Sequence, residues 1–457
     1  KHAESFSRRV EKINDRVYFF AGFGGSNMIA VIGGDSCVLI DTLNGKEVAE
    51  AALTELRKIT DKPVKTIIYT HTHFDHTAGA GVFAEKDTEI IAHTYKTQVY
   101  GSSQLIGRIS QKRGMRQFGP TLTREESICI GIGIWNNPFS TRAMLPPNQL
   151  VDGEKNVISR AGVEFQLVAA PGETDDQMFV WMPEFGILCC GDNYYESWPN
   201  LYAIRGSQYR DISSWIDSLG KMLEYPAEIL IPGHTAVIRG KDQIRETLTN
   251  YRDAIQYVLT ETLKGMDRGL TPDELAETVM LPERFASLPY LQEYYGTVRW
   301  TVRAIFTGYL GWFDGNPTNL GSLPKKEKAD NQIRMMGGAD RIREEITASL
   351  ADGRYQWAAE LCDILLNSDP RCPDVKKMKA EALVGLCERT GKRGGRRKIN
   401  DRNERGAAGG AVSRFCAIRP ASGRHACRMG NRRARVGPST ARQSMIWISI
   451  WRRTVLR

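Results

Sequence analysis

The sequence contains no apolar run long enough to cross a bilayer. The longest apolar stretch near its C-terminus, residues 445–451, falls far short of the ~20 residues that a membrane-spanning helix needs. None of the nine cysteines forms a C-x-x-C pair, and the adjacent Cys189 and Cys190 lie in a predicted strand that sends them to opposite faces. We therefore expect no membrane span, and we interpret these two cysteines as small apolar residues that do not decide the redox compartment.

The main part of the chain lacks a basic excess, although the formal net charge of all 457 residues is +9. From Gly391 onward there are 18 Lys and Arg against 2 Asp and Glu, which leaves 44 basic and 51 acidic residues before that point. The main part is thus about −7 and the tail about +16. Because a nucleic-acid site needs a basic surface, we expect no specific nucleic-acid partner.

A dense cluster of imidazoles is the most informative feature that the sequence does contain. Residues 70–76 read THTHFDH and directly follow the apolar, β-branched run at residues 65–69. Three histidines buried together repel protons and one another unless a cation holds them as neutral ligands. Imidazole and carboxylate donors suit zinc or a neighbouring first-row ion better than calcium. A metal site is our interpretation, and the alternative is a solvated, His-rich loop.

The spacing His-x-His-x-Asp-His after a strand, followed by Gly79, resembles the defining motif of the metallo-β-lactamase superfamily. The resemblance implies an α/β fold, the four-layer αββα sandwich. It also implies that the first two histidines serve one metal and the Asp-His pair a second, so that the site is binuclear.

The residues around the motif agree with this fold. Glycine pairs between β-branched runs predict hairpins up to Asp41, and residues 46–58 have the apolar spacing of a helix. Asp41 ends its strand near the motif and either orients a ligand histidine or is a plain turn residue. His93 is a further candidate ligand, but it follows the motif too closely to complete the first metal site. The irregular residues 100–147 predict a lid or substrate loop.

Three later strands each end in a side chain that can bind metal: Glu173, Asp192 and His234. The carboxyl ends of strands in an α/β fold gather at one edge of the sheets, where distant residues can share ions. Each residue alone could be an ordinary turn residue, but together with the histidine motif they predict a shared site.

The third ligand position distinguishes this chain within the superfamily. Most of its hydrolases, including glyoxalase II, the lactamases and tRNA-processing nucleases, carry a His there, but this sequence has no His between His93 and His234, so Glu173 must take that place. A Glu followed by an acidic residue in a Gly-Asp-Asn context resembles the alkylsulfatase family. Residues 199–206 resemble its sulfate-binding segment, and residues 309–317 its helical-domain signature. The likeness implies that Asn200, Arg205 and Tyr309 hold the sulfate.

The sequence departs in two places from the well-known bacterial members of the alkylsulfatase family. The bridging acid in the well-known bacterial members is Glu, whereas here it is Asp192, one methylene shorter. The loop that carries Glu173 is also shorter, as in the branch of linear primary alkylsulfatases.

The resemblance implies two Zn²⁺ per chain, with Asp75 and Asp192 as the catalytic residues. A shared, metal-activated water would attack the sulfate ester. The expected ligands are His71, His73 and Glu173 for the first zinc, Asp75, His76 and His234 for the second, and Asp192 as the bridge.

We expect three parts in the chain. Residues 1–240 are the catalytic domain, and residues 241–390 form a helical domain that, by the resemblance, makes a homodimer. Thr271 is predicted to cap one of its helices, with Pro272 in the first turn. As the alternative, these amphipathic helices only cover the catalytic sheet.

Residues 391–457 are a basic tail without apolar periodicity. A reading-frame error is our preferred interpretation of the tail, and a genuine basic tail is the alternative. The resemblance implies that relatives continue into a C-terminal domain similar to sterol carrier proteins, and we do not expect residues 391–457 to form it.

The predicted function is hydrolysis of small-molecule alkyl sulfates such as dodecyl sulfate. The alternatives are another hydrolase of this fold, acting on phosphodiesters or thioesters, and a non-catalytic scaffold with a relict site. No signal peptide is visible, but the chain opens at Lys1 rather than Met. We expect a soluble protein that is either cytoplasmic or exported after removal of a leader.

Overall fold

The computed structural model describes residues 2–94, 106–118, 129–134 and 140–393. These residues form two compact units, one reaching Gly315 and the other beginning at Asn316, with residues 115–118 grouped in the second. The predicted basic tail from residue 394 onward lies outside the described residues, as do residues 100–105, 119–128 and 135–139 of the predicted substrate loop.

The first sheet has seven strands in sequence order. Its first four strands are antiparallel, and the last four are parallel to one another. The glycine-rich turns that the sequence predicts join β2 to β3 and β3 to β4. In chain order the strands are β1 Arg9–Lys12, β2 Val17–Ala21, β3 Met28–Ile32, β4 Cys37–Ile40, β5 Val64–Ile68, β6 Glu89–His93 and β7 Gln149–Val151.

The second sheet has six strands in the order β13-β12-β11-β10-β9-β8. Only β11 and β12 are parallel, and the other neighbours are antiparallel. The strands are β8 Lys155–Arg160, β9 Val163–Ala169, β10 Met178–Met182, β11 Ile187–Gly191, β12 Ile229–Pro232 and β13 Ile238–Arg239.

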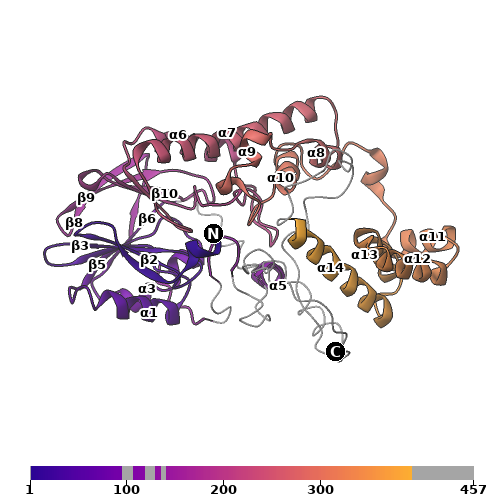
Figure 1. Ribbon diagram of the computed structural model, residues 1–457, viewed down its shortest axis with the longest axis horizontal. Coiled ribbons are helices and arrows are strands. Elements are labelled where there is room, and N and C mark those ends of the chain that lie inside the picture. The colour runs from indigo at the N-terminus through magenta and orange to yellow at the C-terminus, as the bar shows by residue number, and fades with distance from the viewer. Residues whose placement is uncertain (1, 95–105, 119–128, 135–139, 394–457) are drawn as a thin grey trace, which may run out of the picture. The chain divides into compact units, whose positions relative to one another are not determined.

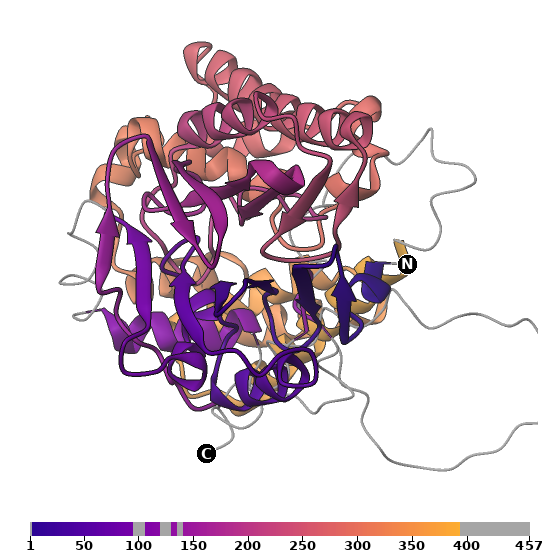
Figure 2. The ribbon, with the colours of Figure 1, turned by 90° about the vertical axis from the view of Figure 1, so that its left-hand side faces the viewer.

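The two sheets stack face to face between helices, which confirms the αββα sandwich (Figure 1). Their shared core includes Phe19 and Val31 from the first sheet and Phe165 and Val180 from the second. Each such side chain contributes roughly 1.5–3 kcal/mol when it is fully buried. Helices α1 Lys46–Leu56 and α3 Ala80–Phe83 cover the outer face of the first sheet, and α6 Ile212–Leu223 and α7 Lys241–Asp267 cover that of the second, as Figure 2 also shows.

Helices α8, α9 and α10 pack with α7 over the second sheet. Thr271 caps α8 through a reciprocal capping box with Glu274, as the sequence predicts. The other elements are α2 Phe74–Thr77, α5 Gly107–Phe118, α8 Pro272–Thr278, α9 Glu283–Ala286, α10 Val298–Leu310 and the short 3-10 turns η1 His2–Phe6, η2 Pro183–Phe185 and η3 Pro289–Leu291.

The second unit is helical and has its own apolar core, which includes Ile346, Leu361 and Ala382. Among the described helices of the chain, none is both long and apolar enough to cross a membrane. The expected division at residues 240 and 390 stays a prediction. The elements of this unit are η4 Pro317–Gly321, α11 Lys325–Met335, α12 Ala339–Ala351, α13 Tyr355–Ser368 and α14 Pro373–Arg393.

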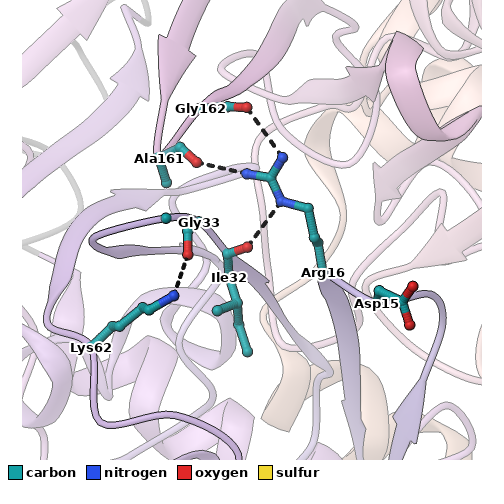
Figure 3. A pocket seen from close by; sticks show the side chains of 8 residues that line it. Asp15, Arg16, Ile32, Gly33, Lys62, Ala161 and Gly162 are labelled. Atoms are coloured by element: carbon teal, nitrogen blue, oxygen red, sulfur yellow. Dashed lines mark hydrogen bonds between the residues drawn. The ribbon is translucent and has the colours of Figure 1, made fainter.

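An open hollow of about 500 Å³ lies where turns of the two sheets meet, at the amino ends of β4, β5 and β9 (Figure 3). Arg16 donates hydrogen bonds to the carbonyl oxygens of Ile32 (3.1 Å), Ala161 (2.7 Å) and Gly162 (3.2 Å). Lys62 donates to the carbonyl of Gly33 at 2.7 Å. Arg16 thus connects turns of the two sheets, and Lys62 connects two turns within the first sheet. We call this region the clasp.

Candidate metal centre

The histidine motif begins where β5 ends and runs into the short helix α2. Asp41, with a positive φ of 59° at the end of β4, accepts hydrogen bonds from the backbone N–H and the hydroxyl of Thr70, both at 2.8 Å. The same carboxylate lies 2.7 Å from Nδ1 of His76. Asp41 therefore has the contacts that an orienting residue requires, which favours that interpretation over a plain turn.

Three histidines have a polar partner at Nδ1 and point Nε2 toward the other ligand candidates. Nδ1 of His76 contacts Asp41, and Nδ1 of His234 donates to the carbonyl of Gly25 at 2.7 Å. Nδ1 of His71 lies 3.1 Å from the hydroxyl of Thr70. A partner on one ring nitrogen sets the tautomer and orientation of an imidazole that binds metal through the other.

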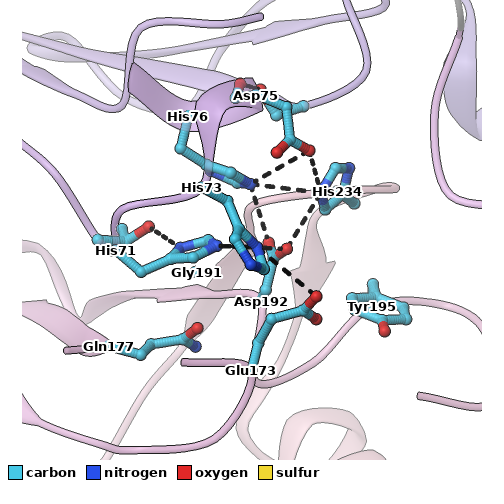
Figure 4. A network of polar contacts seen from close by, with 12 residues as sticks. His71, His73, Asp75, His76, Glu173, Gln177, Gly191, Asp192, Tyr195 and His234 are labelled. Carbon is cyan, nitrogen blue, oxygen red and sulfur yellow. Dashed lines mark hydrogen bonds and ion pairs between the residues drawn. The ribbon is translucent and has the colours of Figure 1, made fainter. Parts of the chain in front are cut away.

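The inward-facing atoms form two groups that lie side by side (Figure 4). In the first group, Nε2 of His71 is 3.1 Å from Nδ1 of His73. In the second, Nε2 of His234 is 3.3 Å from Nε2 of His76 and 3.4 Å from Oδ2 of Asp75. The groups, in each of which the ligand atoms lie within 4.8 Å of one another, are His71, His73 and Asp192, and Asp75, His76 and His234.

Asp192 touches both groups. Its Oδ2 lies 3.7 Å from Nε2 of His71 and 3.2 Å from Nε2 of His234, and its Oδ1 lies 3.3 Å from Nε2 of His76. Glu173 joins the first group, with Oε1 3.6 Å from Nδ1 of His73. The structure thus brings together all seven residues that the sequence predicts as ligands. Their individual assignments stay a prediction.

The donor set fits divalent cations. Oε2 of Glu173 and Oδ1 of Asp192 are buried without a hydrogen-bond partner among the described residues, and such atoms are costly unless a cation meets them. Gly233 leaves room for this approach, because a Cβ there would lie 2.5 Å from Oδ1 of Asp192 and 2.8 Å from Cε1 of His76. Imidazole and carboxylate ligands in this number match zinc.

Burial and neighbouring charges shift the pKa values of the histidines in opposite directions. Burial lowers the pKa of His71 to about 4 and holds that of His73 well below its usual range. Burial also acts on His234, but Asp192 and Asp75 outweigh it and raise the pKa to about 10. The carboxylates thus favour positive charge at His234, in a place where a metal cation would supply it.

Two of the predicted sulfate-binding residues, Asn200 and Arg205, differ in their burial and in their neighbours. Asn200 is buried, and its Nδ2 lacks a hydrogen-bond partner within the part of the chain that the structure describes. Arg205 is half-buried and interacts electrostatically with Tyr295, Glu173 and Asp75. The sulfate-binding roles of Asn200 and Arg205 stay a prediction.

Tyr309 and His93 do not join the seven-residue group. Tyr309 is 48% exposed near the end of α10, where its ring faces Tyr209 at 6.5 Å between centroids. His93 binds the backbone carbonyls of Thr94 and Gly153 through its two ring nitrogens. A sulfate-binding role for Tyr309 stays a prediction.

Sequence reasoning missed two residues beside the centre. Tyr295 precedes α10, and its electrostatic partners include Arg205, Glu173 and Asp75, while burial raises its pKa to about 12. Arg210 lies just before α6 and forms a 2.8 Å ion pair with Glu173. Neither belongs to a periodic or metal-ligand pattern, so no local signal marks them.

The sandwich and the clustered ligands define the metallo-β-lactamase superfamily, whose family model matches residues 21–234. A second model, described as alkyl sulfatase dimerisation, matches residues 271–397. A linear primary-alkylsulfatase of Pseudomonas sp. (strain ATCC 19151) is 34% identical over 363 residues, which are 77% of this chain and 68% of that protein. The chain belongs to the alkylsulfatase family within this superfamily, a family of sulfuric ester hydrolases.

Other relatives are similar to the chain over comparable stretches. An alkyl/aryl-sulfatase of Saccharomyces cerevisiae is 31% identical over 82% of this chain and 60% of its own length. The solved structure of the stereoselective inverting sec-alkylsulfatase Pisa1 from Pseudomonas sp. superposes with a TM-score of 0.78 at 28% identity, over 83% of this chain and 62% of that one. The chain therefore spans about three fifths to two thirds of the length of these relatives.

Proposed function

We propose that this protein hydrolyses alkyl sulfate esters, such as dodecyl sulfate, to the alcohol and inorganic sulfate at a centre of two zinc ions. The observation that carries the proposal is the convergence of seven metal-binding side chains beside Asn200 and Arg205. Identity of 34% to a linear primary-alkylsulfatase supports the substrate class.

The assignment of ligands follows the two groups in Figure 4. Two bound zinc ions would supply an activated water and offset the charge that develops on the sulfate. The proposed ligands are His71, His73 and Glu173 for the first zinc, Asp75, His76 and His234 for the second, and Asp192 for both.

The substrate approaches from the side of His73 and Asp75. Their side chains are 25% and 19% exposed, whereas the other five proposed ligands are at most 3% exposed. Arg205 interacts with both of these residues, so its guanidinium belongs to the same open side. Here it can donate two charge-assisted hydrogen bonds to a sulfate, while Nδ2 of Asn200 donates a third.

Asp75 and Asp192 are the proposed catalytic carboxylates. Burial opposes their ionisation, but His76 and His234 outweigh it and keep the pKa of both groups below its usual range. Both therefore remain ionised hydrogen-bond acceptors at neutral pH, and in this role they would orient the attacking water.

The helical part provides the proposed partner contact. Residues 271–397 match the alkyl sulfatase dimerisation family, and we propose that residues 241–390 join two copies of the chain after the catalytic domain at residues 1–240. Sedimentation equilibrium measures this directly, with a dimer expected.

The function is tested by incubating the zinc-loaded protein with dodecyl sulfate in ¹⁸O-labelled water. We expect release of inorganic sulfate, and the label in either the alcohol or the sulfate tells which bond to oxygen is broken. Bis(4-nitrophenyl) phosphate is tested in parallel. Turnover of the phosphodiester without turnover of any alkyl sulfate would refute the proposal.

A further inference from the structure

A buried arginine lies beside the proposed centre without belonging to it. Only 5% of Arg210 is exposed, and its Nη2 lies 2.8 Å from Oε1 of Glu173. Its Nη1 donates a hydrogen bond to the backbone carbonyl of Asn200. One guanidinium therefore connects a proposed zinc ligand to a proposed sulfate-binding residue.

The contact with Arg210 makes the two oxygens of Glu173 unequal. Oε1 is engaged by the guanidinium, whereas Oε2 is buried and lacks a hydrogen-bond partner in the described part of the molecule. A free carboxylate could present either oxygen to a cation by rotating about its last side-chain bond. Arg210 removes this freedom and fixes the carboxylate with Oε1 3.6 Å from Nδ1 of His73, within the first group.

The same contact matters for charge. The centre contains the carboxylates of Asp75, Glu173 and Asp192, and the side chain of Glu173 is only 3% exposed. A buried carboxylate needs a cation and hydrogen bonds to offset its loss of hydration. Arg210 supplies both, because its side chain is only 4% exposed and its charge lies directly against Oε1.

The second contact acts on Asn200. Its backbone carbonyl accepts from Arg210, and its backbone N–H donates to the hydroxyl of Tyr195 at 2.7 Å. The backbone of Asn200 is thus held at both its N–H and its carbonyl. Its side-chain Nδ2 has no hydrogen-bond partner among the described residues.

We propose that Arg210 is a positioning residue that couples the zinc centre to the substrate segment. It holds the carboxylate of Glu173 in its place beside His73 in the first group, and it fixes the backbone of Asn200. The inference rests on the proposed function for the role of Asn200, but its metal part depends only on the seven-residue centre.

The test measures the zinc affinity of the metal-free protein by competition with a chromophoric chelator, without substrate. Arg210→Met is expected to weaken binding of one zinc ion by about 10–100-fold and leave the other unchanged, as losses of residues that orient a ligand do. Arg210→Lys should lie between, because an ammonium cannot hold Glu173 and Asn200 in the fixed geometry of a guanidinium fork.

A double-mutant cycle with Glu173→Gln separates positioning from general damage. Without the carboxylate, Arg210 has no ligand to orient, so adding Arg210→Met to Glu173→Gln should weaken zinc binding by less than about threefold. If Arg210→Met does not fold, the same cycle with Arg210→Lys decides. Arg160→Met is the matched control, since Arg160 makes a forked pair with Glu89 at 2.6 and 2.9 Å outside the centre and should not affect zinc affinity.

The contact with Asn200 has its own readout. Arg210→Lys should raise KM for dodecyl sulfate at saturating zinc, where the metal sites are filled. Unchanged zinc affinity in Arg210→Met, or equal losses with and without Glu173→Gln, would overturn the inference. Since zinc affinity is measured without substrate, a wild-type protein that binds zinc but does not hydrolyse alkyl sulfates contradicts the proposed function and not the link between Arg210 and Glu173.

Discussion

The two ends of the sandwich use their charged side chains in opposite ways. At the clasp, Arg16 and Lys62 donate hydrogen bonds to backbone carbonyls, and Arg16 thereby connects turns of the two sheets. At the carboxyl ends of the strands, Glu173 and Asp192 are buried, yet each keeps one oxygen without a hydrogen-bond partner among the described residues. A polar cluster whose hydrogen bonds are formed within the protein has a structural role, whereas buried polar atoms without a hydrogen-bond partner indicate a ligand site.

The largest effect should come from Asp192, because it touches both groups of the centre. Asp192→Ala leaves His76 and His234 without their buried carboxylate, and loss of one partner of such a pair costs about 3–5 kcal/mol. We expect kcat/KM for dodecyl sulfate to fall at least about a thousandfold, or about 4 kcal/mol. Steady-state kinetics measure this.

Asp15→Ala is the matched control at the clasp, where Asp15 is exposed and pairs with Lys12. It should retain wild-type kinetics. Substantial activity in Asp192→Ala would show that the two groups do not need a shared carboxylate.

Arg205 should give the next largest effect. Arg205→Ala removes the proposed fork to sulfate and should cost ~2–4 kcal/mol in kcat/KM. Arg205→Lys should recover only part, because an ammonium cannot reproduce two parallel hydrogen bonds. The kinetics of both variants on dodecyl sulfate check this, with Arg239→Ala at an exposed pair with Glu11 as the control. Near wild-type rates in Arg205→Ala would remove Arg205 from the site.

The clasp should show the smallest effect on function. Arg16→Met loses three hydrogen bonds to carbonyls, and we expect the free energy of unfolding to fall by about 1–3 kcal/mol. Zinc content and kcat/KM should stay at wild-type values, as denaturant titration, metal analysis and kinetics together can establish. A loss of zinc in Arg16→Met would mean that the two ends are not independent.

The sequence predicts the part of the centre that is local. Residues 70–76 follow a β-branched strand and run into a short helix, so their backbone path alone brings His71, His73 and His76 together. Glu173, Asp192 and His234 could be assigned because each follows an apolar run, and the carboxyl ends of such strands converge in this fold.

What sequence reasoning missed depends on tertiary packing. Arg210 reaches Glu173 from an irregular segment before α6, and Tyr295 reaches Arg205 from the turn before α10. Their directions are set by how the helices pack on the second sheet, which no spacing in the sequence records. Tyr309 is predicted by resemblance alone; its ring faces that of Tyr209, and its sulfate-binding role stays a prediction.

The central claim is that one buried centre holds two metal ions, and metal analysis of the purified, zinc-replete protein tests it most directly. We predict about two equivalents per chain, falling to about one in His234→Ala, because that variant removes a ligand of the second group only. One equivalent in the wild type that is unchanged in His234→Ala would contradict the account.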